Sequence, residues 1–206
     1  MRNTKVFVAD ASSTDGTPDL VEKFKTSGEL DVEVIPGGLP SVGRNAGATL
    51  ARTDYLLFMD ADVELKDSTL IRRSVERMQR SSLHCVTTNI LCRDGRLFDH
   101  VLYTGSNMCQ YLSRLHQPFA TGMFMMFDRH RFEELGGFNE KALFAEDYLL
   151  SKKVKRSRFR IVRGGVFTTN RRFRKMGRFK TATLFFKTAL NFWNERHFLR
   201  DHEYWK

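Results

Sequence analysis

The chain contains four sets of polar side chains whose types and positions suggest joint chemistry. The first is Asp60 and Asp62, separated by one residue. Two carboxylates so spaced can share a hard divalent cation and leave coordination positions open for the oxygens of a diphosphate. Asp is also common in any turn after a strand, so the triplet alone is a weak signal. Residues 55–59 before it are all apolar, which places the pair at the end of a predicted buried strand.

A second pair of acids, Glu146 and Asp147, begins a predicted helix over about 146–155. The helix macrodipole alone explains two acids in a first turn. The catalytic alternative is that one of them is a general base, which takes the proton from an acceptor hydroxyl. Both interpretations stay open on the residues alone.

Two further sets favour ligand contact. Asp10 and Ser12 lie at the end of a strand and the start of a turn over 12–17, where Asp10 could accept a hydrogen bond from a ligand imide N–H. The structural alternative is a capping turn. Arg44 opens a predicted helix, and a guanidinium there suits a carbonyl or phosphate oxygen. Its structural alternative is a surface salt bridge.

The elements that must position these side chains alternate between strand and helix. The apolar pattern predicts strands over 6–9, 32–35, 55–59, 84–91, 119–127, 159–162 and 166–168. It predicts helices over 18–26, 41–51, 68–79, 97–115, 129–135 and 146–155. This order predicts an α/β fold, with a mostly parallel, doubly wound sheet covered by helices on both faces. The polar sets at 10–17 and 60–62 then share the carboxyl edge, where such sheets bind ligands.

Composition limits the classes of protein. The chain has 206 residues, 41% hydrophobic and 28% charged, which is typical of one globular domain and argues against a disordered chain. Residues 1–150 carry 17 Lys and Arg against 21 Asp and Glu, whereas 151–206 carry 17 against 3, a net charge of +14. Such a basic segment favours phosphates, an anionic membrane or nucleic acid as partner. Three cysteines without a CxxC pair and no apolar run long enough to span a membrane predict a cytoplasmic protein.

Several segments together resemble the family 2 inverting glycosyltransferases. The resemblance covers roughly residues 5–180 and includes the first nucleotide-binding signature, an Arg-Asn-x-Gly segment, the strand with its D-x-D motif, an acceptor loop, a glycine turn and a Glu-Asp pair. In this sequence these are Val8–Thr17, Gly43–Gly47, Tyr55–Asp62, Thr121–Met123, Leu135–Glu140 and Ala145–Tyr148.

The resemblance implies a GT-A fold and inverting transfer of a sugar from a nucleotide-diphosphate donor to an acceptor hydroxyl. It implies that Asp10, with Ser12, and Arg44 contact the nucleotide base, that Asp60 binds ribose or the metal, and that Asp62 binds Mg²⁺ or Mn²⁺. Asp147 would be the catalytic base with Glu146 in support. Two arginines with the spacing of the family's Q/R-x-x-R-W element would contact the diphosphate. These are Arg171 and Arg174.

The sequence departs from the family pattern at two places. Ala11 stands where a second acid is usual, and the chain starts directly at the strand over 6–9, without the strand and helix that usually precede it. We therefore expect an N-terminally incomplete sheet with an unpaired inner edge, which favours a homodimer or low activity.

The expected organisation is one domain over 1–206. Residues 1–92 form the nucleotide-binding half, 93–170 the acceptor half and 171–206 a basic helical segment. The expected acceptor is a carbohydrate, a lipid phosphate or another hydroxyl compound. We also expect peripheral contact with the inner face of a membrane, through a basic helix with Phe and Trp, and no nucleic-acid partner. The alternative function is a weak or inactive module that binds an anionic membrane or nucleic acid through this segment.

Overall fold

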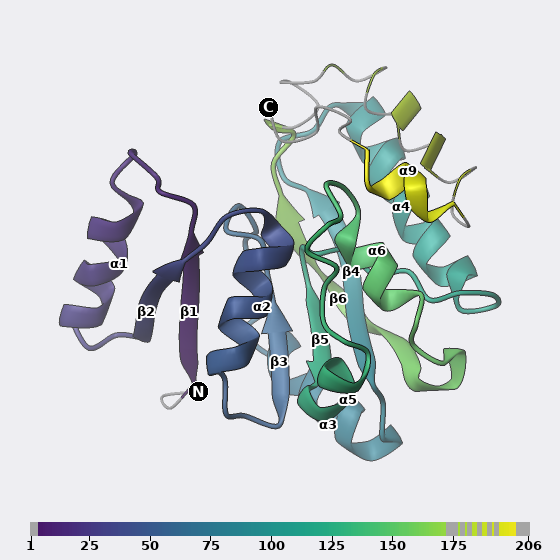
Figure 1. Cartoon of the computed structure of the whole chain (residues 1–206). Coiled ribbons are helices and arrows are strands. Elements are labelled where there is room, and N and C mark those ends of the chain that lie inside the picture. The colour runs from purple at the N-terminus through teal and green to yellow at the C-terminus, as the bar shows by residue number, and fades with distance from the viewer. Residues whose placement is uncertain are drawn as a thin grey trace.

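The computed structural model describes residues 4–171, 177, 180, 183–184, 187–188, 191 and 194–200. Figure 1 shows the whole arrangement. The strands are β1 Lys5–Asp10, β2 Asp31–Pro36, β3 Tyr55–Phe58, β4 Cys85–Cys92, β5 Met125–Asp128 and β6 Phe159–Thr168. The helices are α1 Thr17–Thr26, α2 Pro40–Leu50, α3 Leu70–Ser81, α4 Leu97–Ser113, α5 Arg129–Glu134, α6 Glu146–Ser151 and α9 Glu195–Phe198, with a 3-10 turn η1 at Arg156–Arg158.

The N-terminal unit is a parallel pair of strands with one crossover helix. β1 pairs with β2 in the register Lys5 to Asp31 and Asp10 to Pro36. The helix α1 between them begins with a proline in its first turn, which suits the unpaired N–H groups there. Val21 of α1 is buried, as are Val32 and Ile35 of β2. The alternation predicted for 6–35 is confirmed.

The remaining strands form a four-stranded sheet in the order β3-β5-β4-β6. β5 runs antiparallel to both β3 and β4, whereas β4 and β6 are parallel. The prediction of a strand over 119–127 is wrong for its first part. There the N–H of Phe124 donates to the carbonyl of Thr121 at 3.3 Å and closes a turn, so pairing begins only at Met125.

Two other predicted boundaries are also wrong. The two short strands over 159–162 and 166–168 are one strand, β6. The strand continues through Gly164, which has a φ of 129°. At this point its pairing with β4 shifts in register, between Thr87 and Asn89. The helix predicted over 146–155 ends at Ser151, because the chain turns there and buries Val154.

Helix α2 joins the two sheets. It packs on β1 and β2, while its Ala48 belongs to the core of the larger sheet. Among the described residues, β1 pairs only with β2 and β3 only with β5, so no hydrogen-bonded ladder connects the two sheets. The two sheets are therefore separated between β1 and β3, and in Figure 1 α2 lies in front of the space between these strands.

The larger sheet has an apolar core on each face. One core is rich in aromatic rings, with Phe58, Phe127, Phe132 and Phe138 in edge-on or tilted contact. The other, around Leu70, Met78 and Val86, lies beneath α3. Both faces are covered, as the doubly wound prediction requires. Most of the predicted basic helix beyond residue 171 lies outside the described residues. No described helix is long and apolar enough to cross a membrane.

Candidate active site

The candidate site lies at the carboxyl ends of β1 and β3, the upper edge of these strands in Figure 1. β1 ends at Asp10, and β3 ends two residues before Asp60. Helix α6, which begins at Glu146, supplies the second pair of acids. The fold thus brings together acids that are far apart in the sequence.

Arg44 connects the two acidic pairs. Its Nη2 lies 2.6 Å from Oδ1 of Asp60, and its Nη1 donates to Oε1 of Glu146. The side chain is largely buried and its guanidinium lies 5.4 Å from the ring centre of Phe138. Burial alone would lower the pKa of Arg44, but the charges of Asp60, Glu146 and Asp147 raise it above its usual range. A buried guanidinium with two carboxylate partners fixes both elements in place.

Gly122 makes room for this guanidinium. A Cβ on Gly122 would collide with the terminal nitrogens of Arg44, so any other residue at this position would have to displace the guanidinium. The neighbouring Thr121 has a buried hydroxyl oxygen with no hydrogen-bond partner in the structure. An unpaired buried hydroxyl is costly unless something completes it, so Thr121 is a candidate ligand contact that the residue pattern alone did not single out.

The surroundings of Asp147 raise the pKa of its carboxyl. Its Oδ2 accepts the N–H of Gly122 and its Oδ1 accepts the N–H of Tyr148, both at 2.7 Å. Burial and the adjacent charge of Glu146 raise the pKa of Asp147 to about 7, against the lowering effects of Arg44 and the two N–H groups. The residue as a whole is half-buried, and both of its carboxylate oxygens accept backbone N–H groups. A carboxyl with this pKa can exchange protons near neutral pH.

Asn45 fastens the glycine turn to α2. Its Nδ2 donates to the carbonyl of Phe138 at 2.9 Å, and its Oδ1 accepts the N–H of Phe138 at 3.0 Å. Nδ2 also lies 2.9 Å from Oε1 of Glu140. Arg44 and Asn45 are adjacent in sequence, and together they anchor α2 to Asp60, to Glu146 and to the glycine turn.

Asp10 and Ser12 form a tight turn. Oδ2 of Asp10 accepts the N–H of Ser13 at 3.0 Å, and Ser12 has a φ of 64°. Asp15 accepts both the N–H and the hydroxyl of Thr17, at 3.1 Å and 2.6 Å. These contacts hold the turn together, but the N-cap residue of α1 is Gly16, which makes no side-chain capping hydrogen bond. Contact of Asp10 and Ser12 with a nucleotide base stays a prediction. The same holds for Arg44, whose guanidinium donors face Asp60 and Glu146.

Asp62 lies near Arg171, the first residue of the basic C-terminal segment. Its Oδ2 lies 3.7 Å from Nη2 of Arg171, and both side chains are exposed. Asn170 anchors this arginine from the preceding position, since its N–H donates to Oδ1 of Asp94 at 2.8 Å. The structure thus brings Arg171 to the D-x-D motif. Arg174 lies outside the described residues.

The carboxylates of Asp60 and Asp62 fit a cation that is also coordinated by a bound substrate. In the part of the chain that is described, no group of three or more His, Cys, Asp and Glu side chains converges on a metal position. Arg44 occupies Oδ1 of Asp60, and the side chain of Asp62 is exposed. Mg²⁺ and similar ions are commonly held by one or two carboxylates, with waters and substrate phosphates completing the shell. The two acids therefore suit a metal that arrives with a diphosphate.

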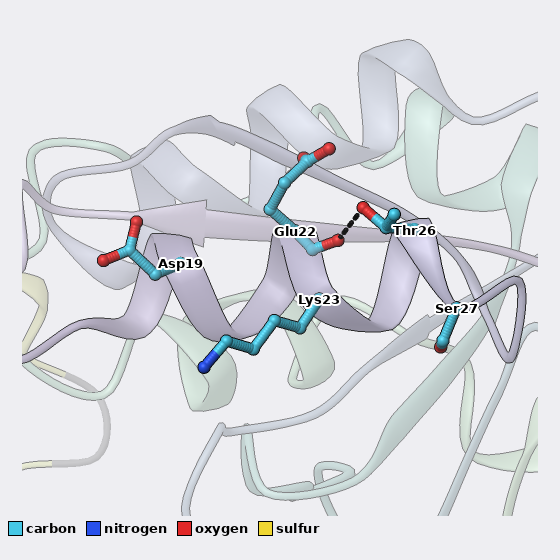
Figure 2. A pocket seen from close by; sticks show the side chains of 5 residues that line it. All are labelled: Asp19, Glu22, Lys23, Thr26 and Ser27. Atoms are coloured by element: carbon cyan, nitrogen blue, oxygen red, sulfur yellow. Dashed lines mark hydrogen bonds between the residues drawn. The ribbon is translucent and has the colours of Figure 1, made fainter.

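Two surface hollows lie away from these acids. One, of about 460 Å³, is the outer face of α1, where Figure 2 shows Asp19, Glu22 and Lys23 along one helix and a hydrogen bond from the hydroxyl of Thr26 to the carbonyl of Glu22. It gathers no side chains from other elements, so it is no candidate for catalysis. The other, of about 210 Å³, lies between β4 and α4.

The chain belongs to glycosyl transferase family 2, whose sequence profile matches residues 1–136. Similar solved structures include the mannosyltransferase PcManGT from Pyrobaculum calidifontis in complex with GDP-Man and Mn²⁺, with 21% identity and a TM-score of 0.61. The alignment covers 79% of this chain and 47% of that one. S. aureus TarS 1-349 in complex with UDP has 18% identity and a TM-score of 0.61, over 80% of this chain and 51% of that one.

These likenesses show the fold of the GT-A glycosyltransferases, as the sequence predicts. A third similar structure is the glucosyl-3-phosphoglycerate synthase from Mycobacterium tuberculosis in complex with phosphoglyceric acid. Its identity is 17% and its TM-score is 0.52, over 84% of this chain and 64% of that one. The chain thus spans about half the length of the first two structures. A search of curated protein sequences finds no match.

Proposed function

We propose that the protein is a metal-dependent, inverting glycosyltransferase that moves a sugar from a nucleotide-diphosphate donor to an acceptor hydroxyl. The observation that carries the proposal is the buried Arg44, which ties Asp60 to Glu146 next to a base with a pKa of about 7. Its further support is membership of family 2 and similarity to structures that contain UDP, or GDP-Man with Mn²⁺.

Each acidic pair has a separate role in this proposal. Asp60 and Asp62 hold Mg²⁺ or Mn²⁺, which when bound neutralises the diphosphate that leaves. Arg171 and Arg174 contact the same diphosphate, while Asp10, Ser12 and Arg44 contact the nucleotide. Asp147 takes the proton of the acceptor hydroxyl, so that the oxygen attacks the anomeric carbon from the face opposite the leaving group. Glu146 supports this base by holding Arg44 beside it.

The organisation and partners follow from this division. Residues 1–92 bind the donor, 93–170 bind the acceptor, and 171–206 are the basic segment. The acceptor is a carbohydrate, a lipid phosphate or another hydroxyl compound, and the protein acts in the cytoplasm, at the inner face of a membrane. A module that only binds membrane or nucleic acid has no use for a carboxyl buried against Gly122 and Glu146, so Asp147 favours the enzyme.

The metal assignment is tested by calorimetry of UDP and GDP binding with and without Mn²⁺. We expect Mn²⁺ to strengthen binding of one nucleotide to the wild type and to have no such effect on Asp62→Ala. Glu22→Ala, an exposed acid of α1 away from the site, is the matched control and should behave as the wild type. Equal binding by wild type and Asp62→Ala under both conditions would show that the metal assignment is wrong.

The base assignment is tested by the pH dependence of nucleotide-diphosphate release from donor sugars. A base acts only when deprotonated, so kcat/KM should rise with pH through about 7, the pKa of Asp147. Asp147→Asn should lower kcat by at least about a hundredfold, the usual contribution of a general base, and leave donor binding intact. Transfer by Asp147→Asn at the wild-type rate would rule out this role.

A further inference from the structure

Helix α4 is amphipathic, but it turns polar side chains toward the protein and an apolar stripe toward the solvent. Three polar side chains in its second half, those of Asn107, Gln110 and Ser113, are hydrogen-bonded to the rest of the protein. Asn107 holds both backbone groups of Ile90, accepting its N–H and donating to its carbonyl at 2.9 Å each. Gln110 is fully buried and accepts the hydroxyl of Thr87 at 3.3 Å. Ser113 accepts the N–H of Phe119 at 2.9 Å. The polar face of α4 is thus the structural one.

The opposite face of α4 is apolar and exposed. Its side chains recur every three or four positions along the helix and onto the turn after it, so they form one stripe. The members, with their exposed fractions, are Leu97 81%, Val101 58%, Met108 58%, Leu112 57% and Leu115 73%. We call these five residues the α4 stripe. At their spacing Gly105 fills the remaining place, and nothing lies within 4 Å of where its Cβ would be.

This arrangement is unusual for a helix that faces water. A surface helix normally turns its apolar stripe to the core and its polar face outward, but α4 does the opposite. Several large aliphatic side chains aligned on one face mark a contact surface rather than scattered exposure. Helix α4 lies on the flank of the molecule opposite β1 and β2 in Figure 1.

Arginines stand at both ends of the stripe. Arg96 precedes Leu97, and Arg114 precedes Leu115. Arg156 donates to the carbonyl of Leu115 at 2.6 Å, and so belongs to the same end. Across the described residues, no acidic group lies within ion-pair distance of these three guanidiniums. Positive charge is concentrated further at the second end, where Arg114 and Arg77 lower the pKa of Arg160 after the larger effect of its burial.

The positions of these charges discriminate between possible occupants. A second copy docked through the same stripe would bring arginines against arginines, whether the two α4 helices ran parallel or antiparallel. A surface of anionic phospholipids offers apolar chains to the stripe and negative headgroups to the arginines at both ends. We infer that the α4 stripe and its flanking Arg96, Arg114 and Arg156 form a docking surface for an anionic phospholipid membrane.

The inference is tested with the full chain by co-sedimentation with vesicles. Vesicles of phosphatidylcholine mixed with phosphatidylglycerol are compared with vesicles of phosphatidylcholine alone. We expect the wild type to bind the mixed vesicles and Met108→Glu/Leu112→Glu to bind at least tenfold more weakly, since carboxylates replace two inserting side chains. The matched control, Leu20→Glu/Leu30→Glu, adds the same charge at exposed apolar positions of the N-terminal unit and should bind as the wild type.

The charged flank has its own variant. Arg114→Gln should weaken binding about fivefold, the effect of one basic residue near an anionic surface. Arg72→Gln, an exposed arginine of α3, is the control for equal loss of charge and should change binding less.

Three results would overturn the inference. Unchanged vesicle binding by Met108→Glu/Leu112→Glu would assign the contact to the basic segment instead. Equal binding to both kinds of vesicle would remove the role of the arginines. A wild-type dimer in sedimentation velocity that becomes monomeric in the double variant would make the stripe a protein interface. UDP and GDP binding, measured in parallel, should be unaffected by these variants, so that the outcome is independent of the proposed catalytic function.

Discussion

The two sides of the candidate site are built differently. The side formed by β3 to β6 rests on two apolar cores with fully buried aromatic rings. The side formed by β1, α1 and β2 contributes no residue to these cores as far as the chain is described, and it exposes Val6, Leu20, Phe24, Leu30 and Val34. The proposed base Asp147 thus lies on a firmly packed body, whereas the proposed nucleotide contacts Asp10 and Ser12 lie on a unit that packs against α2. Local opening free energies follow apolar packing, so the N-terminal unit should open first.

The largest effect should come from Phe127→Ala, which removes a fully buried ring in contact with Phe58 and Phe132. We expect a loss of about 3–5 kcal/mol in the free energy of unfolding, measured by urea denaturation. Hydrogen exchange then tests the comparison. Amides of β4 and β5 should lose protection in step with global stability, while those of β1 and β2 change less. Equal losses in both would mean that the chain unfolds as one unit.

Asn45→Ala should weaken the attachment of the glycine turn. The change leaves the N–H and the carbonyl of Phe138 without their side-chain partner, which costs about 1–3 kcal/mol in stability for a buried polar group. Thr49→Ala on the same helix is the control, since its hydroxyl only donates to the carbonyl of Asn45 on an exposed turn. Thermal denaturation of both variants measures the difference. A loss in Thr49→Ala as large as in Asn45→Ala would contradict the role of the clamp.

Gly43→Ala probes the contact between α2 and the N-terminal unit. A Cβ at this position would lie 2.7 Å from the Cβ of Ala9, so α2 and β1 must separate. We expect a loss of about 1–3 kcal/mol, the usual cost of overpacking, and lower affinity for UDP and GDP as β1 moves. Denaturation and calorimetry measure the two effects. Unchanged nucleotide affinity would show that the donor site does not depend on how β1 is seated.

The sequence predicts most of the elements, because their signals are local. The strand at Tyr55–Phe58 is an apolar run, and α3 shows the helical period, so both are found close to their predicted places. The predictions fail where a residue far away in the sequence determines the backbone conformation. The run over 119–127 is apolar except for Thr121, yet Gly122 lies in a turn and donates its N–H to Asp147, 25 positions away. Apolar pattern carries no information about such a partner.

The site shows the same division. The family resemblance predicts roles at the site for Asp60, Asp62, Glu146 and Asp147, and these roles stay predictions. It does not reveal that Arg44 joins Asp60 to Glu146, because Glu146 lies 102 positions from Arg44 and no spacing rule connects the two. The α4 stripe is different again. Its helical period is visible in the sequence, but whether an apolar stripe faces the core or the solvent depends on what the opposite face packs against.

The smallest expected effect has the opposite sign and comes from Gly47→Ala, one helical turn after Gly43. Here a Cβ would lie 3.6 Å from the Cβ of Phe7 and 3.7 Å from Cδ1 of Ile35, which is ordinary contact. Alanine is the better helix former by up to about 1 kcal/mol, so the variant should be slightly more stable in urea denaturation. The gain should appear as slower hydrogen exchange in β1 and β2, because α2 holds them. Destabilisation equal to that of Gly43→Ala would mean that α2 is pressed against the N-terminal unit along its whole length, and the proposed difference between the two sides would fall with it.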